Sequence, residues 1–194
     1  MISIEEIKND LKNRLTHERY THSLNVMHTA SILATRYGVD KKKAELAGLI
    51  HDCARDLPAD IQLKMATDFG ILLDEIEKLQ PELVHGPLGA FIARKQYGID
   101  DDEVIRAVTI HSTGDKFMTS FDKILFIADY VEPGRCFPSV ESIRKKLARD
   151  LDEALLSAFS STIKYVVDRG WYLHPKTISA RNFLLAQKGR EGNT

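Results

Sequence analysis

The chain is poor in cysteine, and its two cysteines suit neither a metal site nor a disulfide framework. Cys53 and Cys136 lie far apart, and neither has a second cysteine at metal-ligand spacing. This excludes zinc sites built on thiolates and the disulfide scaffolds of small secreted proteins. Free thiols are typical of a reducing compartment, so we predict a cytoplasmic location.

Long apolar runs and an excess of charge of one sign are also missing. The longest apolar stretches are far too short to cross a bilayer, and no secretory leader opens the chain, so we expect no membrane partner. The 27 basic residues nearly balance the 28 acidic residues, and the net charge of −1 gives no basic field for a nucleic-acid duplex. The sequence does contain 43% hydrophobic residues over 194 positions, enough for one domain with a substantial core.

Proline, glycine and strand-like alternation are scarce as well. Several of the 6 prolines and 11 glycines separate segments of helical length, and no segment alternates as a half-buried strand does. The sequence therefore predicts an all-α fold, a single compact helical bundle over residues 1–187 with a loose tail over 188–194. The residues expected to cap helices are Asp40, Asp100, Ser120 and Thr177.

A histidine and an aspartate interrupt one of the apolar helical segments. His51 and Asp52 stand side by side in the segment 44–55. His51 continues the apolar stripe of Ala44 and Ala47, so its side chain faces the core. Burying an ionised carboxylate without a partner is costly, and a buried imidazole needs partners for both ring nitrogens. A cation bound by both side chains satisfies both needs.

Further polar residues of the same kind each lie in an apolar segment of their own. A lone histidine on an apolar face is usually a hydrogen-bonded core residue. Taken alone, His85 is better interpreted in this way, and for His111 the pattern does not distinguish a core residue from a ligand. Together the residues are hard to explain structurally, because the stripes do not contain a matching basic residue for each of them. The additional candidates are His22, His85, His111 and Asp129, whereas His17 and His28 lie off the apolar faces and His174 is undecided.

Histidine nitrogen and carboxylate oxygen without thiolate suit iron, manganese, zinc or cobalt better than calcium. His85 and His111 would hold a second ion if Asp52 bridged two metals, and paired metals roughly 3.5–4 Å apart are usual in phosphoryl hydrolysis. Alternatively, either histidine could serve as a general acid. We therefore expect one or two divalent ions between the core helices, the first bound by His22, His51, Asp52 and Asp129.

Arginines stand where an anion over this site would lie. Arg19 precedes one candidate ligand by three residues and Arg55 follows another by four, so each guanidinium shares a helical face with a ligand. Arg135 follows the Asp129 segment directly and could reach the same anion. Trp171, Tyr172 and His174 offer flat surfaces for a nucleobase, although these side chains could equally belong to the core.

These motifs together resemble one family over nearly the whole chain, to about Asn182. The pattern His22…His51-Asp52…Asp129 is similar to that of the HD-domain superfamily of metal-dependent phosphohydrolases. Finer motifs resemble its bacterial symmetrical bis(5′-nucleosyl)-tetraphosphatases, the YqeK-type family. They are Arg19-Tyr20-Thr21-His22-Ser23, the segment from Ala47 to Arg55, His85-Gly86-Pro87, His111-Ser112-Thr113-Gly114 and the segment from Ala128 to Pro138.

The resemblance implies an HD-domain bundle that hydrolyses diadenosine tetraphosphate to two ADP, with iron as the metal. We expect catalytic roles for Asp52, Arg19, Arg55, His85 and His111. Two departures are mild, because the family commonly has Lys where Arg55 stands and Thr where Ser112 stands. Nucleotide contacts are expected at Arg19, Arg55, His85, His111, Arg135, Gly170, Trp171, Tyr172, His174 and Pro175.

Three other functions compete with this interpretation. One is a different HD chemistry, either a nucleoside monophosphatase or a cyclic-nucleotide phosphodiesterase. The second is a nucleotide sensor that keeps the metal without turnover, and the third is a helical interaction module, which would leave the buried polar residues unexplained. The sequence leaves a homodimer open and does not select among dinucleoside polyphosphates.

Overall fold

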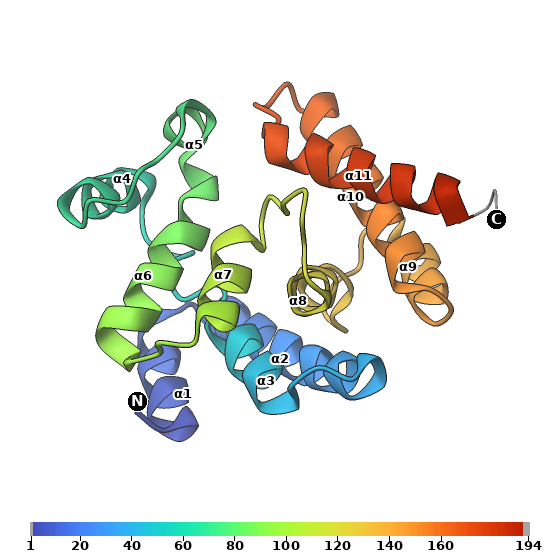
Figure 1. Ribbon diagram of the computed structural model, residues 1–194. Coiled ribbons are helices and arrows are strands. Elements are labelled where there is room, and N and C mark those ends of the chain that lie inside the picture. The colour runs from blue at the N-terminus through green and yellow to red at the C-terminus, as the bar shows by residue number, and fades with distance from the viewer. Residues whose placement is uncertain (1, 192–194) are drawn as a thin grey trace.

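The computed structural model describes residues 2–191, and every regular element in that range is helical (Figure 1). No β-strand occurs among these residues, which confirms the predicted all-α class. Within the same range, no helix combines the length and the apolar character needed to cross a membrane. The elements are α1 (Ile4–Arg14), α2 (His17–Tyr37), α3 (Lys41–Ile50), α4 (Ala59–Asp68), α5 (Glu75–Leu79), the 3₁₀ helix η1 (Pro81–Leu83), α6 (His85–Tyr97), α7 (Asp102–Ile110), α8 (Ser120–Val131), α9 (Val140–Leu147), α10 (Leu151–Asp168) and α11 (Pro175–Glu191).

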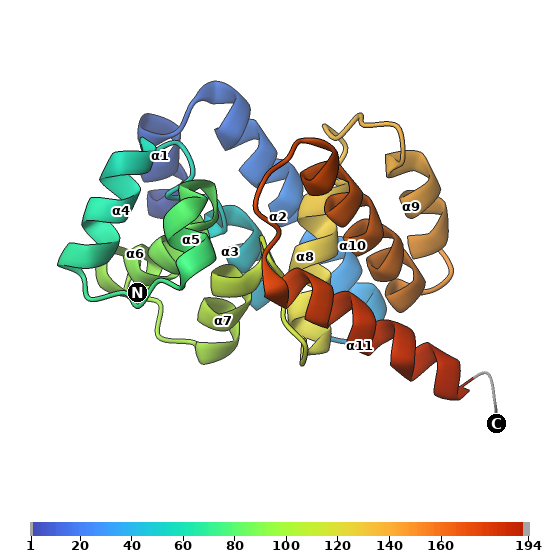
Figure 2. The same cartoon turned by 90° about the horizontal axis from the view of Figure 1, so that it is seen from above.

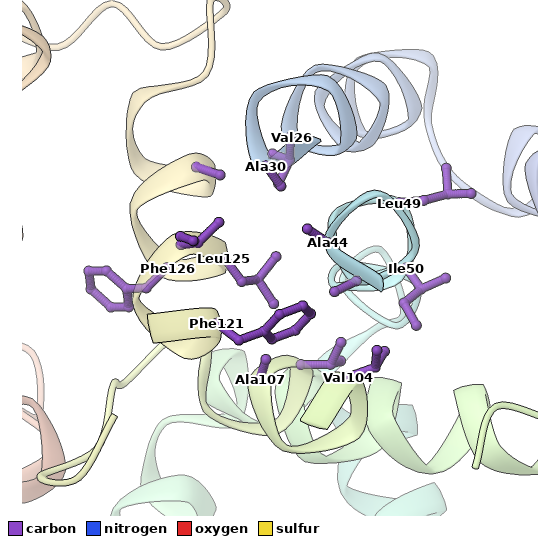
Figure 3. Close-up of a cluster of buried hydrophobic side chains, with 14 of the residues drawn as sticks. Val26, Ala30, Ala44, Leu49, Ile50, Val104, Ala107, Phe121, Leu125 and Phe126 are labelled. Atoms are coloured by element: carbon purple, nitrogen blue, oxygen red, sulfur yellow. The ribbon is translucent and has the colours of Figure 1, made fainter. Parts of the chain in front are cut away.

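The hydrophobic core gathers around α8. Figure 3 shows Phe121 and Leu125 of α8 pointing toward α3 and α7, while Phe126 points to the other side of the helix. On that side the Phe126 ring lies 4.4 Å from the ring of Phe159 on α10. Seen from above in Figure 2, α4, α5 and α6 lie on one side of α8, and α9, α10 and α11 lie on the other. Because α8 is covered on both sides, most of its residues are buried.

Helices α2 and α3 approach each other at the level of the backbone. A Cβ atom on Gly48 of α3 would lie only 2.7 Å from Met27 Cα of α2, so the close packing requires a glycine. His22 lies on α2 and His51 directly follows α3. The glycine contact therefore sets how closely these two imidazoles approach.

Several helix boundaries differ from the prediction by a few residues. Asp40 caps α3 as predicted, by accepting a hydrogen bond from Lys43 N. The cap of α7 is Asp101 and not Asp100, because the Asp101 carboxylate accepts from the backbone of Val104. Similarly, Thr119 and not Ser120 caps α8, and α11 begins at Pro175, so Thr177 is not its cap.

The last helix continues past the predicted end of the ordered domain. The sequence predicts a loose tail from residue 188, whereas α11 runs to Glu191. Lys188 is part of that helix and its Nζ lies 3.0 Å from Asp150 Oδ2, an ion pair that local composition does not reveal. The remaining part of the predicted tail, residues 192–194, lies outside the described residues.

Candidate active site

The six predicted ligand residues come together, and three of them stand at helix ends. His51 is the C-cap of α3 and His111 is the C-cap of α7, while His85 opens α6. The segment 44–55 is not one continuous helix as predicted. After Ile50 the backbone makes tighter bonds, such as Cys53 N to Ile50 O, and Asp52 lies in this turn. His22 and Asp129 project from within α2 and α8.

One half of the cluster joins four of these side chains. The Nε2 atoms of His22 and His51 lie 3.2 Å apart. Asp129 Oδ1 lies 3.0 Å from His22 Nε2 and 3.8 Å from His51 Nε2. Asp52 Oδ2 lies 3.3 Å from His51 Nε2 and 3.5 Å from His22 Nε2. Both carboxylates thus lie next to the same pair of imidazole Nε2 atoms.

The other half of the cluster uses the second oxygen of the same aspartate. The Nε2 atoms of His85 and His111 lie 3.0 Å apart. Asp52 Oδ1 lies 3.3 Å from His85 Nε2 and 3.6 Å from His111 Nε2. The carboxylate of Asp52, which is only 3% exposed, therefore faces both halves at once.

Hydrogen bonds at the opposite ring nitrogens orient the four imidazoles. Oxygens that can only accept lie next to each Nδ1, so Nδ1 carries a proton, and Nε2 can offer its lone pair to a cation when the imidazole is neutral. The Nδ1 atoms of His51, His85 and His111 lie 2.8, 2.5 and 2.7 Å from the carbonyl oxygens of Gly48, Glu82 and Val108, and His22 Nδ1 lies 3.1 Å from Glu132 Oε1.

This arrangement fits a divalent cation. Two facing imidazole nitrogens repel each other unless a proton or a cation lies between them, and both halves contain such a pair. Ligand atoms about 2.1 Å from one ion are separated by about 3.0 Å at right angles and by about 3.4 Å at tetrahedral angles. Most of the separations in the cluster, 3.0 to 3.6 Å, lie within or close to that range.

The electrostatics also favour bound cations. Burial acts to raise the pKa of Asp52, but the neighbouring His51 charge and the histidine hydrogen bonds outweigh it and hold this pKa well below its usual range. Burial likewise opposes ionisation of Asp129, yet Arg135 and His22 keep its pKa low. Burial lowers the pKa of His85, which favours the neutral imidazole that binds metals. The carboxylates are thus charged at neutral pH.

Arginines surround the cluster as the sequence predicts. Arg19 Nη1 lies 2.7 Å from Asp52 Oδ2, and the guanidinium of Arg135 contacts Asp129. Arg55 is half-buried, and its Nη1 lies 3.4 Å from the carbonyl oxygen of Glu82. These guanidiniums can also bind oxyanions placed next to the cluster.

The cluster forms the floor of a cavity of about 770 Å³, a volume typical of small-molecule sites. Arg19, Arg55 and Arg135 line it together with Ser112, which follows His111. The far wall comes from α8, the loop between α8 and α9, and α10. Its residues are Phe126, Tyr130, Phe137, Pro138, Ser139, Ser161, Thr162, Lys164, Tyr165 and Asp168.

The predicted nucleotide segment Gly170–Pro175 does not line this cavity. Its His174 is buried, receives a hydrogen bond at Nδ1 from Lys176 N, and donates from Nε2 to Asp74 Oδ2 at 2.8 Å. Both ring nitrogens are thereby satisfied, so the structure supports the structural reading for His174. Trp171 is 46% exposed and its ring centroid lies 5.8 Å from that of Tyr165, a residue of the cavity wall.

Sequence reasoning assigned no role to Glu132, which the structure places directly behind His22. Glu132 is the C-cap of α8 and is only 3% exposed. Its Oε1 lies 3.1 Å from His22 Nδ1. A glutamate at a helix end normally suggests a solvated side chain, and only its position one turn after Asp129 could have drawn attention to it.

Comparison with known proteins agrees with this geometry. The chain matches the HD domain over residues 19–134, a span that contains all six candidate ligands. It is 34% identical over 182 residues to the symmetrical bis(5′-nucleosyl)-tetraphosphatase of Bacillus subtilis, covering 94% of this chain and 97% of that protein. The protein of the same name from Halalkalibacterium halodurans is 36% identical over 178 residues, covering 92% and 95%.

A solved structure is similar throughout. The crystal structure of a predicted HD superfamily hydrolase involved in NAD metabolism from Clostridium acetobutylicum has a TM-score of 0.93 and 44% sequence identity, over 96% of this chain and 99% of that chain. The HD domain implies a divalent metal, and the cluster around Asp52 has the donor atoms to bind one. The chain therefore belongs to the HD domain family and, within it, to the family of the symmetrical bis(5′-nucleosyl)-tetraphosphatases.

Proposed function

We propose that this protein hydrolyses diadenosine tetraphosphate and related dinucleoside polyphosphates symmetrically, releasing two ADP. The observation that carries the proposal is the cluster in which one buried carboxylate, Asp52, faces two histidine pairs at the floor of a large cavity. The relatives that match more than nine-tenths of this chain carry the name of that activity. The geometry adds a chemical reason for it.

The donor atoms suggest how metal would be bound. His22, His51, Asp52 and Asp129 would hold one ion, and His85, His111 and the other oxygen of Asp52 would hold a second. A bound divalent ion would lower the pKa of a water molecule and neutralise phosphate charge. We propose iron as that ion, because mixed nitrogen and oxygen ligands without thiolate suit it, as they also suit manganese, cobalt and zinc.

The arginines would position the polyphosphate. Arg19 lies beside the first half of the cluster, Arg135 beside Asp129, and Arg55 near the opening of α6. Three guanidiniums that line one cavity would offer paired donors to successive phosphates and so place the central bridging oxygen over the cluster. Fixed positive charges of this kind stabilise the charge that develops on the phosphates during attack.

The adenosine groups have room on the far wall of the cavity. Tyr130, Phe137 and Tyr165 present aromatic rings there, and bases stack on aromatic rings favourably. Direct nucleotide contacts of Trp171 and Tyr172, which do not line the cavity, stay a prediction. A cytoplasmic location, which the free thiols Cys53 and Cys136 suit, and a homodimer are also predictions.

Product analysis in isotopically labelled water tests the proposal. The metal-loaded protein is incubated with diadenosine tetraphosphate in H₂¹⁸O, and the products are identified by mass spectrometry. We expect ADP alone, with one label for each pair of ADP molecules, and no turnover by the His51→Ala variant. Formation of ATP and AMP would show asymmetric attack, and release of phosphate from AMP alone would indicate a monophosphatase. Either result would refute the proposal.

A further inference from the structure

His22 differs from the other three histidines of the cluster in what supports its ring. His51, His85 and His111 each donate from Nδ1 to a neutral backbone carbonyl. His22 instead donates to the carboxylate of Glu132, with 3.1 Å between Nδ1 and Oε1. Only the half of the cluster that contains His22 thus has a charged acceptor behind an imidazole.

The position of Glu132 is well defined on all sides. Its Oε2 accepts from Asn25 Nδ2 at 2.8 Å and from the backbone N–H of Gly134 at 2.5 Å. Arg144 holds the local backbone by donating to the carbonyl oxygen of Glu132 at 2.6 Å. The titratable or charged groups that face the carboxylate are His22 and, 3.9 Å away, the Nε of Arg135.

Gly134 leaves room for the Glu132 carboxylate because it has no side chain. A Cβ atom there would lie 3.0 Å from both carboxylate oxygens of Glu132, closer than ordinary contacts. The absence of a side chain lets the turn after α8 close onto the carboxylate and donate its N–H. The sequence Glu132-Pro133-Gly134 therefore builds a support for one carboxylate, and that carboxylate is directed at His22.

The charge behind His22 has a chemical consequence. A carboxylate that accepts the Nδ1 proton fixes the tautomer and the ring orientation, and it makes Nε2 a stronger donor to a metal. A neutral carbonyl fixes the ring in the same way but adds no charge. The half of the cluster around His22 also contains Asp129, whereas the half around His85 and His111 has only its share of Asp52.

We propose that Glu132 is a positioning residue that makes the half of the cluster around His22 the tighter of the two cation sites. This inference rests on the proposed function, because it presumes that the cluster binds metal. Glu132 does not contact the cation or the substrate and acts only through His22. The metal would accordingly load in order, with the ion at His22, His51, Asp52 and Asp129 bound first and most firmly.

Replacing Glu132 by glutamine separates charge from shape. Glutamine has nearly the same volume, but one of its two terminal atoms is an NH₂ group that cannot accept. That group must face either His22 Nδ1 or the donors Asn25 and Gly134, so one set of bonds is lost together with the charge. The Asn25→Ala variant removes only one bond to Glu132 and keeps the charge, and it provides a milder second test if the first variant folds poorly.

The control variant is Asp122→Asn, at the opposite end of the same helix. Asp122 is also a buried carboxylate, 2% exposed, and it is paired with Arg106 and with the backbone N–H of Thr119. It has no contact with the cluster. Asp122→Asn therefore reproduces two side effects of Glu132→Gln, the loss of a buried charge on α8 and any general loss of stability.

The experiment titrates Co²⁺ into metal-free wild-type protein and the variants, following visible absorption for coordination geometry and calorimetry for affinity. For Glu132→Gln we expect the tighter dissociation constant to rise about 10–100-fold, with a changed spectrum of the first ion and the second affinity within about threefold of wild type. We expect a several-fold rise for Asn25→Ala and no change for Asp122→Asn.

The opposing results are distinct from failure of the proposed function. Wild-type affinity and spectrum in both Glu132→Gln and Asn25→Ala, or equal weakening of both ions, would overturn the role of Glu132. Loss of first-ion affinity in Asp122→Asn as large as that in Glu132→Gln would make the effect a general one and would also overturn it. If wild-type protein bound Co²⁺ in this order but did not cleave diadenosine tetraphosphate, the proposed function would fail and this inference would stand.

Discussion

One added methyl group at Gly48 should pull the site apart. A Cβ atom at this position would lie 2.7 Å from Met27 Cα, 2.8 Å from Met27 N and 3.0 Å from the carbonyl carbon of Val26. All three are backbone atoms, so no side-chain rotation can relieve the contact. Ordinary contacts to a Cβ begin at 3.4 Å, and α2 and α3 would therefore have to separate locally by about 0.7 Å.

That displacement is large compared with the tolerance of a metal site, about 0.2 Å in ligand distance. His51 lies one turn after Gly48, and His22 lies little more than one turn before Met27, so their Nε2 atoms would move apart with the helices. We expect Gly48→Ala to lower the free energy of unfolding by about 1–3 kcal/mol, the usual cost of overpacking. Affinity for the first ion should fall about 10–100-fold, as it does when the support of a ligand is disturbed.

The matched control is Gly189→Ala on α11, where an added Cβ would have no atom within 4 Å. Because alanine favours a helix over glycine by about 1 kcal/mol, this variant should be unchanged or slightly more stable. Denaturant unfolding of the metal-free proteins and calorimetric titration of the folded proteins measure the two effects. A folded Gly48→Ala protein with wild-type metal affinity would refute the view that the α2–α3 spacing sets the ligand separation.

Three further predictions concern single side chains. Arg55→Lys should retain more activity than Arg55→Ala, because lysine keeps a positive charge next to the phosphate and loses only the planar guanidinium. Equal steady-state rates in the two variants and wild type would place the phosphate contact elsewhere. His85→Ala should keep one tightly bound ion and lose most of its activity. Metal analysis and turnover assays on the same preparation measure the two, and unchanged activity would return His85 to a core role. Burial raises the pKa of the Cys53 thiol to about 12, so this thiol stays protonated at about pH 8. It should react with a disulfide reagent only after unfolding, whereas exposed Cys136 reacts at once. Two fast-reacting thiols in the native protein would contradict this.

The convergence of the candidate ligands could be predicted because burial of a charged or hydrogen-bonding group is costly wherever it happens in a fold. His51, Asp52 and Asp129 lie in apolar segments, and that local fact is enough to require a partner. The helical class follows in the same way from periodicity. Neither inference needs to know which helices are neighbours.

Features that depend on distant contacts or on competition between similar turns could not be predicted. The apolar pattern of 44–55 continues past Ile50, but the backbone changes to tighter hydrogen bonds there, and propensity does not distinguish the two. His174 is satisfied by Asp74, whose carboxylate comes from a segment a hundred positions earlier in the chain. Likewise, nothing local shows that Glu132 turns inward to His22.

The candidate ligands come from parts of the chain far apart in sequence, from His22 on α2 to Asp129 on α8. A cation held there would act as a crosslink that exists only in the folded chain, and it would stabilise that chain by about 2.7 kcal/mol when free ion exceeds the dissociation constant a hundredfold. In a cell depleted of the metal, the protein would lose this stability as well as its turnover. Chaperones and proteases would then remove more of it. Metal supply would thus control how much of the enzyme persists, in addition to how fast each molecule works.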